Sequence, residues 1–421
     1  MSMRNLRCII WLVFVWGGTG SFAQLLTIEQ CYEMARKNYP LIKQKDLLVK
    51  SLEFTIANAQ SGYLPQVSIY AQATYQSEVT RLPGPGVLVE PLSKDQYKIY
   101  GEISQSIYDG GAIKNQGSIQ SASTMVEQQK LEVELYKIRD RINQIYFGVL
   151  LMDAQLIQVD LLKNDLKTSL DKTESAIRNG TAFKSNADIL KAEVLKSDQR
   201  VIEVKFARKG YLDMLSFFIS RSLSPEVVLE KPLDILFDPG PTIKRPELTL
   251  YEFQQELLGA QHKSTATRTM PRLGFFVQGG YGRPALNQLK NEFDVYYLGG
   301  FRLNWALSGL YNNHRDRQLL EVNSQVVLAQ RDAFLFNTNL SLVQQSQEVE
   351  RLQALIKVDG QIIELRTKIK NTSQSQYENG VISTSDFIRE LNAEDVAKQN
   401  LLLHQVQLIL AHYNYQNTSG N

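Results

Sequence analysis

Histidines, cysteines and glycine-rich motifs often form catalytic, metal-binding or nucleotide-binding sites. In this sequence they match no known pattern of such a site. The spacing of Gly280, Gly282 and Ala285 approaches a dinucleotide-binding fingerprint, but Pro284 and the lack of a following helix remove the context that this motif needs. No G-x-S-x-G nucleophile elbow occurs. The histidines are scattered, and none lies in the H-E-x-x-H pattern of zinc sites: His262, His314, His404 and His412. We therefore expect no catalytic residue, no metal, no cofactor and no enzymatic activity.

The charge balance and the cysteines exclude further classes of protein. The chain has 46 Lys and Arg against 44 Asp and Glu. Removing residues 1–23, which hold two Arg and no acid, leaves 44 bases and 44 acids (46 − 2 = 44), so we expect no nucleic-acid partner. Cys31 is the only cysteine outside that segment, which leaves no disulfide framework.

Residues 1–23 read as a secretory signal peptide. Arg4 and Arg7 precede the apolar run 8–16, and small residues lead to Ala23, where we expect cleavage. Beyond residue 24 we find no apolar run of the roughly 18 residues or more that a helical span needs. A chain that leaves the cytoplasm and enters a membrane without such a run must do so as β-strands.

Four stretches alternate apolar and polar side chains with the period of a β-strand. They are 66–76 and 97–107 in the first half of the chain, and 273–281 and 295–307 in the second. Each has about ten residues, the length that a tilted strand needs to cross a hydrocarbon core of about 30 Å. Aromatic residues on these stretches suit either an interfacial girdle or an ordinary soluble sheet: Tyr75, Tyr97, Tyr281, Tyr297, Phe301 and Trp305.

The polar positions of the same stretches are candidates for the lining of an aqueous lumen. Gln72, Glu102 and Arg302 each alternate with apolar neighbours, so each is expected on the face opposite to the lipid. An exposed edge in a soluble sheet would accept Glu102 and Arg302 equally well.

Long helices with coiled-coil spacing fill the rest of each half. Apolar residues from Leu131 to Val159 and from Leu319 to Val343 advance by alternating steps of three and four. Residues 113–178 contain no proline, so as one helix they would extend roughly 100 Å. Shorter helices are expected at 27–60, 248–267, 185–222 and 383–415. The sequence thus predicts an α+β membrane protein in which four long transmembrane strands join a helical coiled-coil barrel.

The two halves share one plan. Pro40, Pro65 and Tyr75 recur 206 residues later, and the pair Asn179-Gly180 recurs 200 residues later as Asn379-Gly380. We therefore predict a first structural repeat at 24–222, a proline-rich linker at 223–244 and a second repeat at 245–421.

Four strands are too few to close a barrel, since about eight is the practical minimum. An open sheet in lipid would leave backbone amide and carbonyl groups of its edges without partners, at several kcal/mol each. Neighbouring copies of the chain must therefore supply the missing strands, which makes an oligomer obligatory.

Six segments carry a resemblance to the TolC-like outer-membrane channel-tunnel family of efflux and type I secretion systems. They are LLTIEQCYEMARKNYPLIKQ, GYLPQVSIYAQ and its repeat MPRLGFFVQGG, SQSIYDGGAIKNQ, NGTAFKSNADIL and YENGVISTSDFI. The resemblance extends over essentially the whole mature chain, from about Leu25 to Tyr415. The resemblance implies a homotrimer with a shared twelve-stranded barrel in the outer membrane and a helical tunnel in the periplasm. It also implies two protein partners, a periplasmic adaptor (membrane fusion) protein and an inner-membrane pump. The channel itself is then a passive export duct.

The resemblance also assigns roles to the two helical hairpins. It implies adaptor docking at Asn179, Gly180 and Thr181 in the first hairpin and at Asn379, Gly380 and Val381 in the second. Family members carry acidic gate residues at the position of Asp386 and three residues later, where this chain has Arg389. The first repeat offers Asp188 and Lys191, so these four residues are gate candidates of mixed charge.

Plainer interpretations remain open for these residues and for the whole chain. Asp188 and Asp386 follow a helix break, where a carboxylate commonly caps the next helix. The Asn-Gly pairs suit helix ends in left-handed backbone geometry. We expect Gly309 to supply the unusual backbone angles at the second strand-to-helix turn. A secreted coiled-coil scaffold or adaptor-like interaction protein is the alternative function, although such a protein has no use for the four alternating strands.

Overall fold

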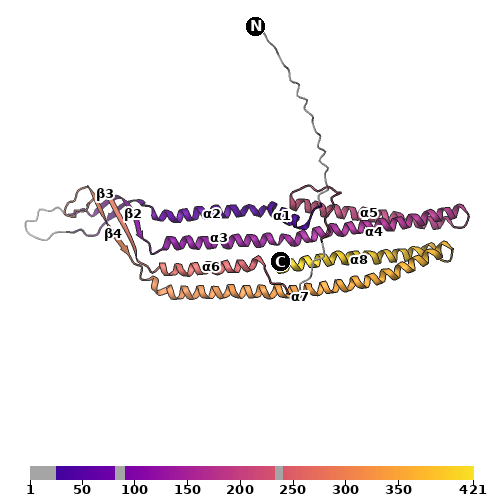
Figure 1. Ribbon diagram of the computed structural model, residues 1–421. Coiled ribbons are helices and arrows are strands. Elements are labelled where there is room, and N and C mark those ends of the chain that lie inside the picture. Colours follow the sequence, from indigo (N-terminus) through magenta and orange to yellow (C-terminus); the bar gives the residue numbers. More distant parts are fainter. Residues whose placement is uncertain (1–24, 81–90, 233–239) are drawn as a thin grey trace, which may run out of the picture. The chain divides into compact units, whose positions relative to one another are not determined.

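The computed structural model describes residues 25–80, 91–232 and 240–421 (Figure 1). The expected signal peptide at 1–23 and part of the expected linker, 233–239, lie outside the described residues. The described chain divides into two compact units. One contains the strands with their adjoining helices, and the other contains the two helical hairpins.

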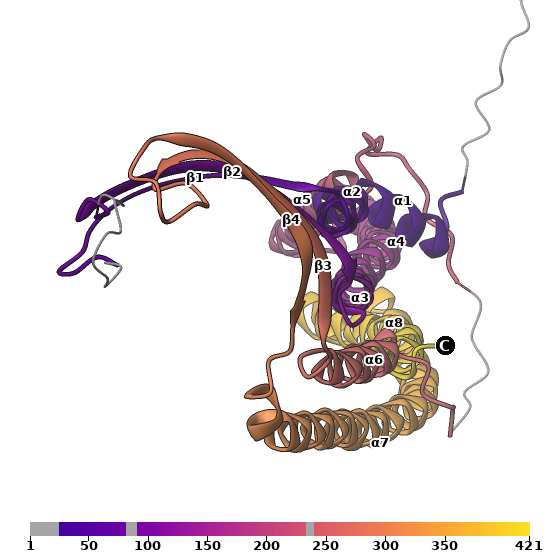
Figure 2. The same ribbon diagram turned by 90° about the vertical axis from the view of Figure 1, so that its left-hand side faces the viewer.

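The strand unit is built on one antiparallel sheet with the order β1-β2-β3-β4 (Figure 2). The strands are β1 (Gln66–Tyr75), β2 (Asp95–Tyr108), β3 (Arg272–Arg283) and β4 (Asp294–Asn304). All four expected strands are confirmed, with one error at the end of the last. β4 stops at Asn304, because the N–H groups of Leu307 and Gly309 bond back to the carbonyls of Trp305 and Ala306 and turn the chain toward the next helix.

The sheet register places the apolar alternating residues on one common face. Ile69 lies opposite Gly101, Gly101 opposite Gly279 and Gly279 opposite Tyr297. Since directly opposed residues of an antiparallel pair project to the same side, the alternating sets of all four strands align. The sheet therefore has one apolar face and one mixed, largely polar face.

Helices extend from one end of the sheet within the same unit (Figure 1). α2 (Lys43–Gln60) and α6 (Pro246–Thr267) both pack against α3 (Ala112–Tyr136). The expected helical stretch at 27–60 is helical but is not one continuous helix. It is divided into α1 (Ile28–Asn38), the 3₁₀ turn η1 (Pro40–Ile42) and α2, because Pro40 cannot donate a backbone hydrogen bond and disfavours helix at the residue before it. A second 3₁₀ turn, η2 (Ser61–Tyr63), leads into β1.

The hairpin unit contains most of α1 and two helical hairpins. Its first hairpin pairs α4 (Ile138–Arg178) with α5 (Lys184–Ile219), and its second pairs the later part of α7 (Gly309–Glu378) with α8 (Thr384–Ser419) (Figure 1). The expected single helix at 113–178 is interrupted once, at Lys137. The distance from the Lys137 N–H to the Val133 carbonyl is 3.4 Å, which is longer than an ordinary hydrogen bond of a helix.

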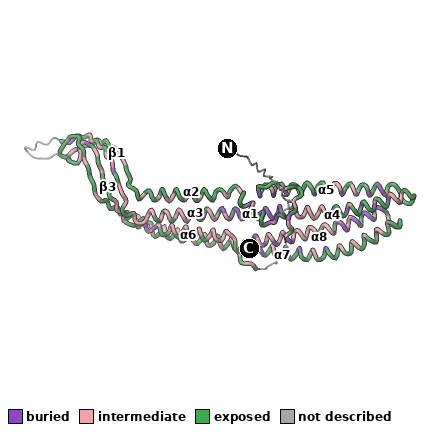
Figure 3. Tube along the Cα trace, turned by 45° about the horizontal axis from the view of Figure 1, so that its top comes forward, coloured by how far each residue is buried: buried purple, intermediate pink, exposed green. Residues whose placement is uncertain are grey.

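The two coiled-coil seams differ in burial (Figure 3). On α4 the seam residues Ile142 and Val149 are fully buried. On α7 the seam residues Leu319 and Phe336 are 61% and 69% exposed in the single chain. The seam that runs into the first hairpin is therefore covered within the chain, and the seam from Leu319 to Val343 is not.

One helical stretch, Ala112–Arg178, contains a window long and apolar enough to cross a membrane by length and composition, with 39% of that window buried. This window averages over interspersed polar residues, so it differs from the unbroken apolar run that the sequence lacks. Core helices of soluble proteins also meet these criteria of length and composition, so we do not assign a membrane-spanning helix to this stretch.

Candidate functional site

The apolar face of the sheet is open to its surroundings in the single chain. Ile69 is 77% exposed and Tyr297 is 85% exposed, and their apolar neighbours on this face are similarly uncovered. Exposed apolar surface of this extent is rare on monomeric soluble proteins and marks contact with a membrane or another protein. Among the described residues, β1 and β4 each have a single neighbouring strand, so both edges are available for pairing.

The other face carries a charged cluster at the level of Glu102. The Arg302 Nη1 atom lies 3.1 Å from the Glu102 Oε1 atom, and the Gln278 side-chain amide donates to the other carboxylate oxygen. Glu102 is almost completely buried by these partners. The structure thus brings together two of the three expected lumen residues. The third, Gln72, is exposed on the same face, in a row with Lys98.

Aromatic side chains gather near one end of the sheet. Phe293 stacks on Tyr281 with ring centroids 5.4 Å apart and lies 6.4 Å from the Tyr97 ring. The Arg283 guanidinium lies over both Tyr97 and Phe293. Trp305 does not belong to the sheet, and its indole N–H donates to the Thr269 carbonyl at 3.0 Å. Sequence reasoning missed Phe293, which lies just outside the alternating segments.

The two strand-to-helix turns are stabilised by different local structures. After β2, Gly110 and Gly111 take left-handed angles, and the Asp109 carboxylate accepts the N–H groups of Gly111 and Ile113 at 2.8 and 2.7 Å. This carboxylate caps α3, a role that sequence reasoning did not assign. The expectation for Gly309 is wrong. It is not among the left-handed glycines of the described chain, and its constraint is space, since a Cβ atom there would lie 3.2 Å from the Arg268 carbonyl oxygen.

Both hairpin turns end their first helix in the expected left-handed geometry. Gly180 has φ of 73° and Gly380 has φ of 71°. The following residues bond back five positions, from the Thr181 N–H to the Ala176 carbonyl and from the Val381 N–H to the Gln376 carbonyl. Asn179 and Asn379 directly precede the glycines, and their N–H groups still make helical hydrogen bonds, to the Ser175 and Ser375 carbonyls. The bonds that reach back five positions satisfy helix-end carbonyls by the Schellman pattern.

The gate candidates of the first hairpin do not cap a helix. α5 begins at Lys184, so Asp188 lies one turn inside it and is exposed. Lys191 lies 2.9 Å from the Glu174 carboxylate of α4, which joins the two helices of one hairpin. Hydrogen bonding across this pair raises the pKa of Lys191 and lowers the pKa of Glu174.

The gate candidates of the second hairpin are tied to the start of α8. The Ser383 hydroxyl donates to Asp386 at 2.7 Å and accepts the Asp386 N–H at 3.2 Å, which makes Ser383 the cap and Asp386 its partner. This hydroxyl, with the nearby Arg389 guanidinium at 3.1 Å, lowers the pKa of Asp386. α5 and α8 start 200 residues apart (384 − 184 = 200), and the residue at that spacing before Asp386 is Asn186 and not Asp188.

Polar links join the two hairpins at residues that sequence reasoning did not find. The Lys172 ammonium lies 2.7 Å from Glu378, and the hydroxyls of Thr173 and Tyr377 are 2.7 Å apart. Further along, Gln158 donates to the buried Asp395 at 2.9 Å. The two partners of each link are more than 200 residues apart in the sequence. Their separation differs from one link to the next, so the shared plan of the two halves does not predict these contacts.

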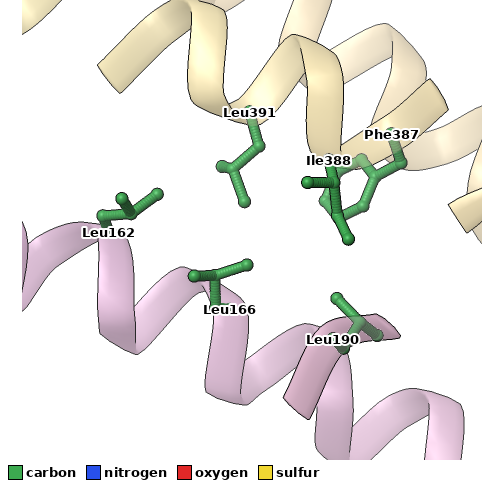
Figure 4. Packing of buried hydrophobic residues seen from close by; sticks show 6 residues of the cluster. All are labelled: Leu162, Leu166, Leu190, Phe387, Ile388 and Leu391. Carbon is green, nitrogen blue, oxygen red and sulfur yellow. The ribbon is translucent and has the colours of Figure 1, made fainter. Parts of the chain in front are cut away.

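An apolar cluster lies beside these links. Leu162 and Leu166 from α4 and Leu190 from α5 face three residues of α8, namely Phe387, Ile388 and Leu391 (Figure 4). The Tyr377 ring stacks on Phe387 with centroids 5.1 Å apart and planes 4° apart. A groove of about 730 Å³ lies between the hairpin ends, lined by residues of both turns, including Thr181 and Gly380.

Possible metal ligands are dispersed in the described part of the chain. No group of three or more His, Cys, Asp or Glu that could hold a metal ion occurs among the described residues. His404 Nδ1 lies 2.6 Å from Asp359, which links α8 to α7 as an isolated pair. Cys31 is buried, and burial raises the pKa of its thiol to about 12, so its reactive thiolate is scarce at neutral pH.

The link between Lys172 and Glu378 should depend on pH. The hydrogen bond from Lys172 holds the pKa of Glu378 below its usual value, so the pair stabilises the folded state above that usual value and is lost as the pH falls through the lowered one. We expect Glu378→Gln to lower hairpin protection against hydrogen exchange at pH 7, and we expect a smaller difference from wild type at pH 3. A difference of the same size at both values would contradict this assignment.

Comparison with known proteins finds similarity in structure only. No protein-family model and no curated protein sequence matches the chain. The outer membrane protein VceC from Vibrio cholerae aligns with a TM-score of 0.66 and 14% identity over 94% of this chain and 96% of VceC. The Campylobacter jejuni outer membrane channel CmeC aligns at 0.63 and 13%, over 93% and 85% of the two chains.

A third solved structure agrees with these two. The open state of the Neisseria gonorrhoeae outer membrane channel MtrE aligns at 0.64 and 11%, over 94% of this chain and 89% of MtrE. All three alignments extend over nearly the whole of each chain, so they include the sheet and both hairpins. At these identities the likeness establishes the fold, and the chain has the fold of TolC-like outer-membrane channels.

Proposed function

We propose that this chain is the outer-membrane channel component of a tripartite efflux or type I secretion system. It would form a passive duct across the outer membrane and into the periplasm, with the energy supplied by an inner-membrane pump. The three similar structures are of outer-membrane proteins, two of them named as channels, which supports this assignment.

The observation that carries the proposal is the two-faced sheet. Its apolar face is exposed across all four strands, its other face holds the cluster of Glu102, Gln278 and Arg302, and both edge strands are open. A lipid-facing sheet must be closed, because unpaired backbone groups cost several kcal/mol each in hydrocarbon. Three copies would close it into one twelve-stranded barrel around Gln72, Glu102 and Arg302.

The exposed seam of α7 supports the same oligomer. Its apolar residues from Leu319 to Val343 are spaced for coiled-coil packing and lack cover in the single chain. In a homotrimer, a helix of the neighbouring copy would cover this seam, and the helices together would enclose a periplasmic tunnel.

The hairpin turns are the proposed contact with a periplasmic adaptor protein. Asn179, Gly180 and Thr181 in one turn and Asn379, Gly380 and Val381 in the other present exposed surface beside the groove between them. We propose Asp188, Lys191, Asp386 and Arg389 as residues of the tunnel entrance. Because acids and bases are mixed there, the entrance would have a weaker preference for cations than a ring of carboxylates.

The chain organisation fits this proposal. We propose that 24–222 and 245–421 are two copies of one structural repeat joined by the linker 223–244, and that residues 1–23 direct export. The order helix, strand, strand, long helix, helix occurs in each half, and β1 and β3 begin 206 residues apart (272 − 66 = 206).

Fractionation and conductance test the function. After expression of the full chain in a Gram-negative host, we expect the protein to remain with outer membranes through a carbonate wash. Chemical cross-linking of detergent-extracted protein should give trimers, and planar bilayers should show stepwise conductance. A secreted scaffold, which is the alternative, would wash off the membrane and conduct nothing, and that result would reject the channel.

A further inference from the structure

One level of the sheet's polar face is occupied by tyrosines. The register places Tyr70 opposite Tyr100, Tyr100 opposite Gly280 and Gly280 opposite Tyr296, one position from each strand. We call these four positions the tyrosine row. The levels on either side are polar or charged at most positions, with Glu102 and Gln278 on one side and Gln72, Lys98 and Asp294 on the other.

The rings of the tyrosine row lie close together. Tyr70 and Tyr100 are stacked, with centroids 5.1 Å apart and planes 26° apart. A Cβ atom at Gly280 would lie 2.5 Å from the Tyr100 Cβ and 2.9 Å from the Tyr296 Cζ, so these two side chains occupy the space that a larger residue would need. Glycine weakens a strand, and its presence here is explained by the close approach of these two tyrosines and of the Ile99 carbonyl oxygen, 2.7 Å from the same Cβ position.

The rings remain accessible from the polar side. Tyr70 is 45% exposed, and Tyr100 and Tyr296 are half-buried. An aqueous lumen needs only a polar lining, so three partly exposed rings at one level exceed what water passage requires. The same face already holds a cation on an aromatic ring, since the Arg302 guanidinium lies 4.4 Å from the centroid of Phe276. The negative ring faces of such residues attract positive charge.

We infer that the tyrosine row is a contact site in the channel lumen for cations that carry an aromatic ring. This inference rests on the proposed function, because it takes the polar face as the wall of the duct. A passing ring would stack on Tyr70 or Tyr296 while its charge lies against a neighbouring ring face. Each contact is weak, which suits a duct that must release what it binds.

Channel block in planar bilayers tests the inference with two probes of equal charge. Benzyltrimethylammonium carries a ring, and tetramethylammonium does not. With the wild-type channel we expect the ring-bearing probe to block current at a concentration lower by about 2- to 10-fold, the range given by one aromatic contact. Tyr70→Leu should reduce this preference and Tyr70→Phe should keep it. Thr74→Ala, on the same strand and face, is the matched control and should behave as wild type.

The outcomes separate the site from the channel. Equal block by both probes, or an unchanged preference in Tyr70→Leu, overturns the tyrosine row while stepwise conductance still supports the duct. A folded trimer without conductance overturns the duct. In that case saturation-transfer NMR on the wild-type chain in detergent, with benzyltrimethylammonium as the probe, tests binding at the tyrosine row without the need for conductance. Transfer to the benzyl protons that is lost in Tyr70→Leu supports it, and no transfer in wild type rejects it. The NMR result with wild type also decides the matter if Tyr70→Leu does not assemble.

Discussion

Replacing Ile69 by arginine is expected to stop the chain from assembling in the outer membrane. Ile69 lies near the middle of β1 on the apolar face, where it is 77% exposed in the single chain. If this face meets lipid, an arginine near the midplane costs about 2 to 4 kcal/mol. In a homotrimer each of the three copies would contain the arginine, so the total destabilisation would be three times as large. The readout is the fraction of protein that resists a carbonate wash and migrates as a trimer.

Gln72→Arg is the matched control for Ile69→Arg. Residues 69 and 72 differ by an odd number in one strand, so their side chains project to opposite faces. Gln72 is exposed on the polar face, beside Lys98 in the register. The variant should assemble as wild type does and change only single-channel conductance and ion preference. If the two arginines impair assembly equally, the assignment of faces is wrong.

Phe387→Ala should loosen the hairpin unit severely. The Phe387 side chain is only 2% exposed, is stacked on Tyr377 and is surrounded by leucines of α4 and α5 (Figure 4). Removing a buried aromatic ring leaves a cavity and typically costs about 3 to 5 kcal/mol. Hydrogen exchange should accelerate in α8 and in the facing turns of α4. Exchange in the sheet should be unchanged, because the strands belong to the other compact unit.

Phe183→Ala controls for the loss of a phenyl ring as such. Phe183 precedes α5 and is 79% exposed, so its truncation creates no cavity. We expect a change of about 0.5 kcal/mol or less, the usual range for surface positions. Equal acceleration of exchange in both variants would mean that the apolar cluster around Phe387 does not hold the hairpins together.

The strand positions were predictable because their pattern is local. Alternation with a period of two identifies a strand whatever it later pairs with, and it located β1 to β4 within a few residues. It failed at Trp305 and Leu307, where apolar residues continue the alternation past the strand end. A backbone turn decides that boundary, through bonds from the Leu307 and Gly309 N–H groups. Periodicity contains no information about such bonds.

The contacts between distant segments were not predictable from pattern. Glu102 and Arg302 were each expected on the polar face, but their ion pair depends on the register of two strand pairings. The link from Lys172 to Glu378 depends in the same way on how the two hairpins pack. Asp188 and Asp386 were both chosen as gate candidates for their residue type, but they lie at different distances from the starts of α5 and α8.

The sequence alone determined where the four strands lie and that they have two different faces, because side-chain period depends only on the order of residues. Tertiary structure decided which apolar surfaces find cover inside the chain. The seams of α4 and α7 have the same spacing, yet Ile142 and Val149 are fully buried while Leu319 and Phe336 are exposed. Burial is a property of the neighbours that surround a residue in space, and the spacing of a seam cannot specify those neighbours.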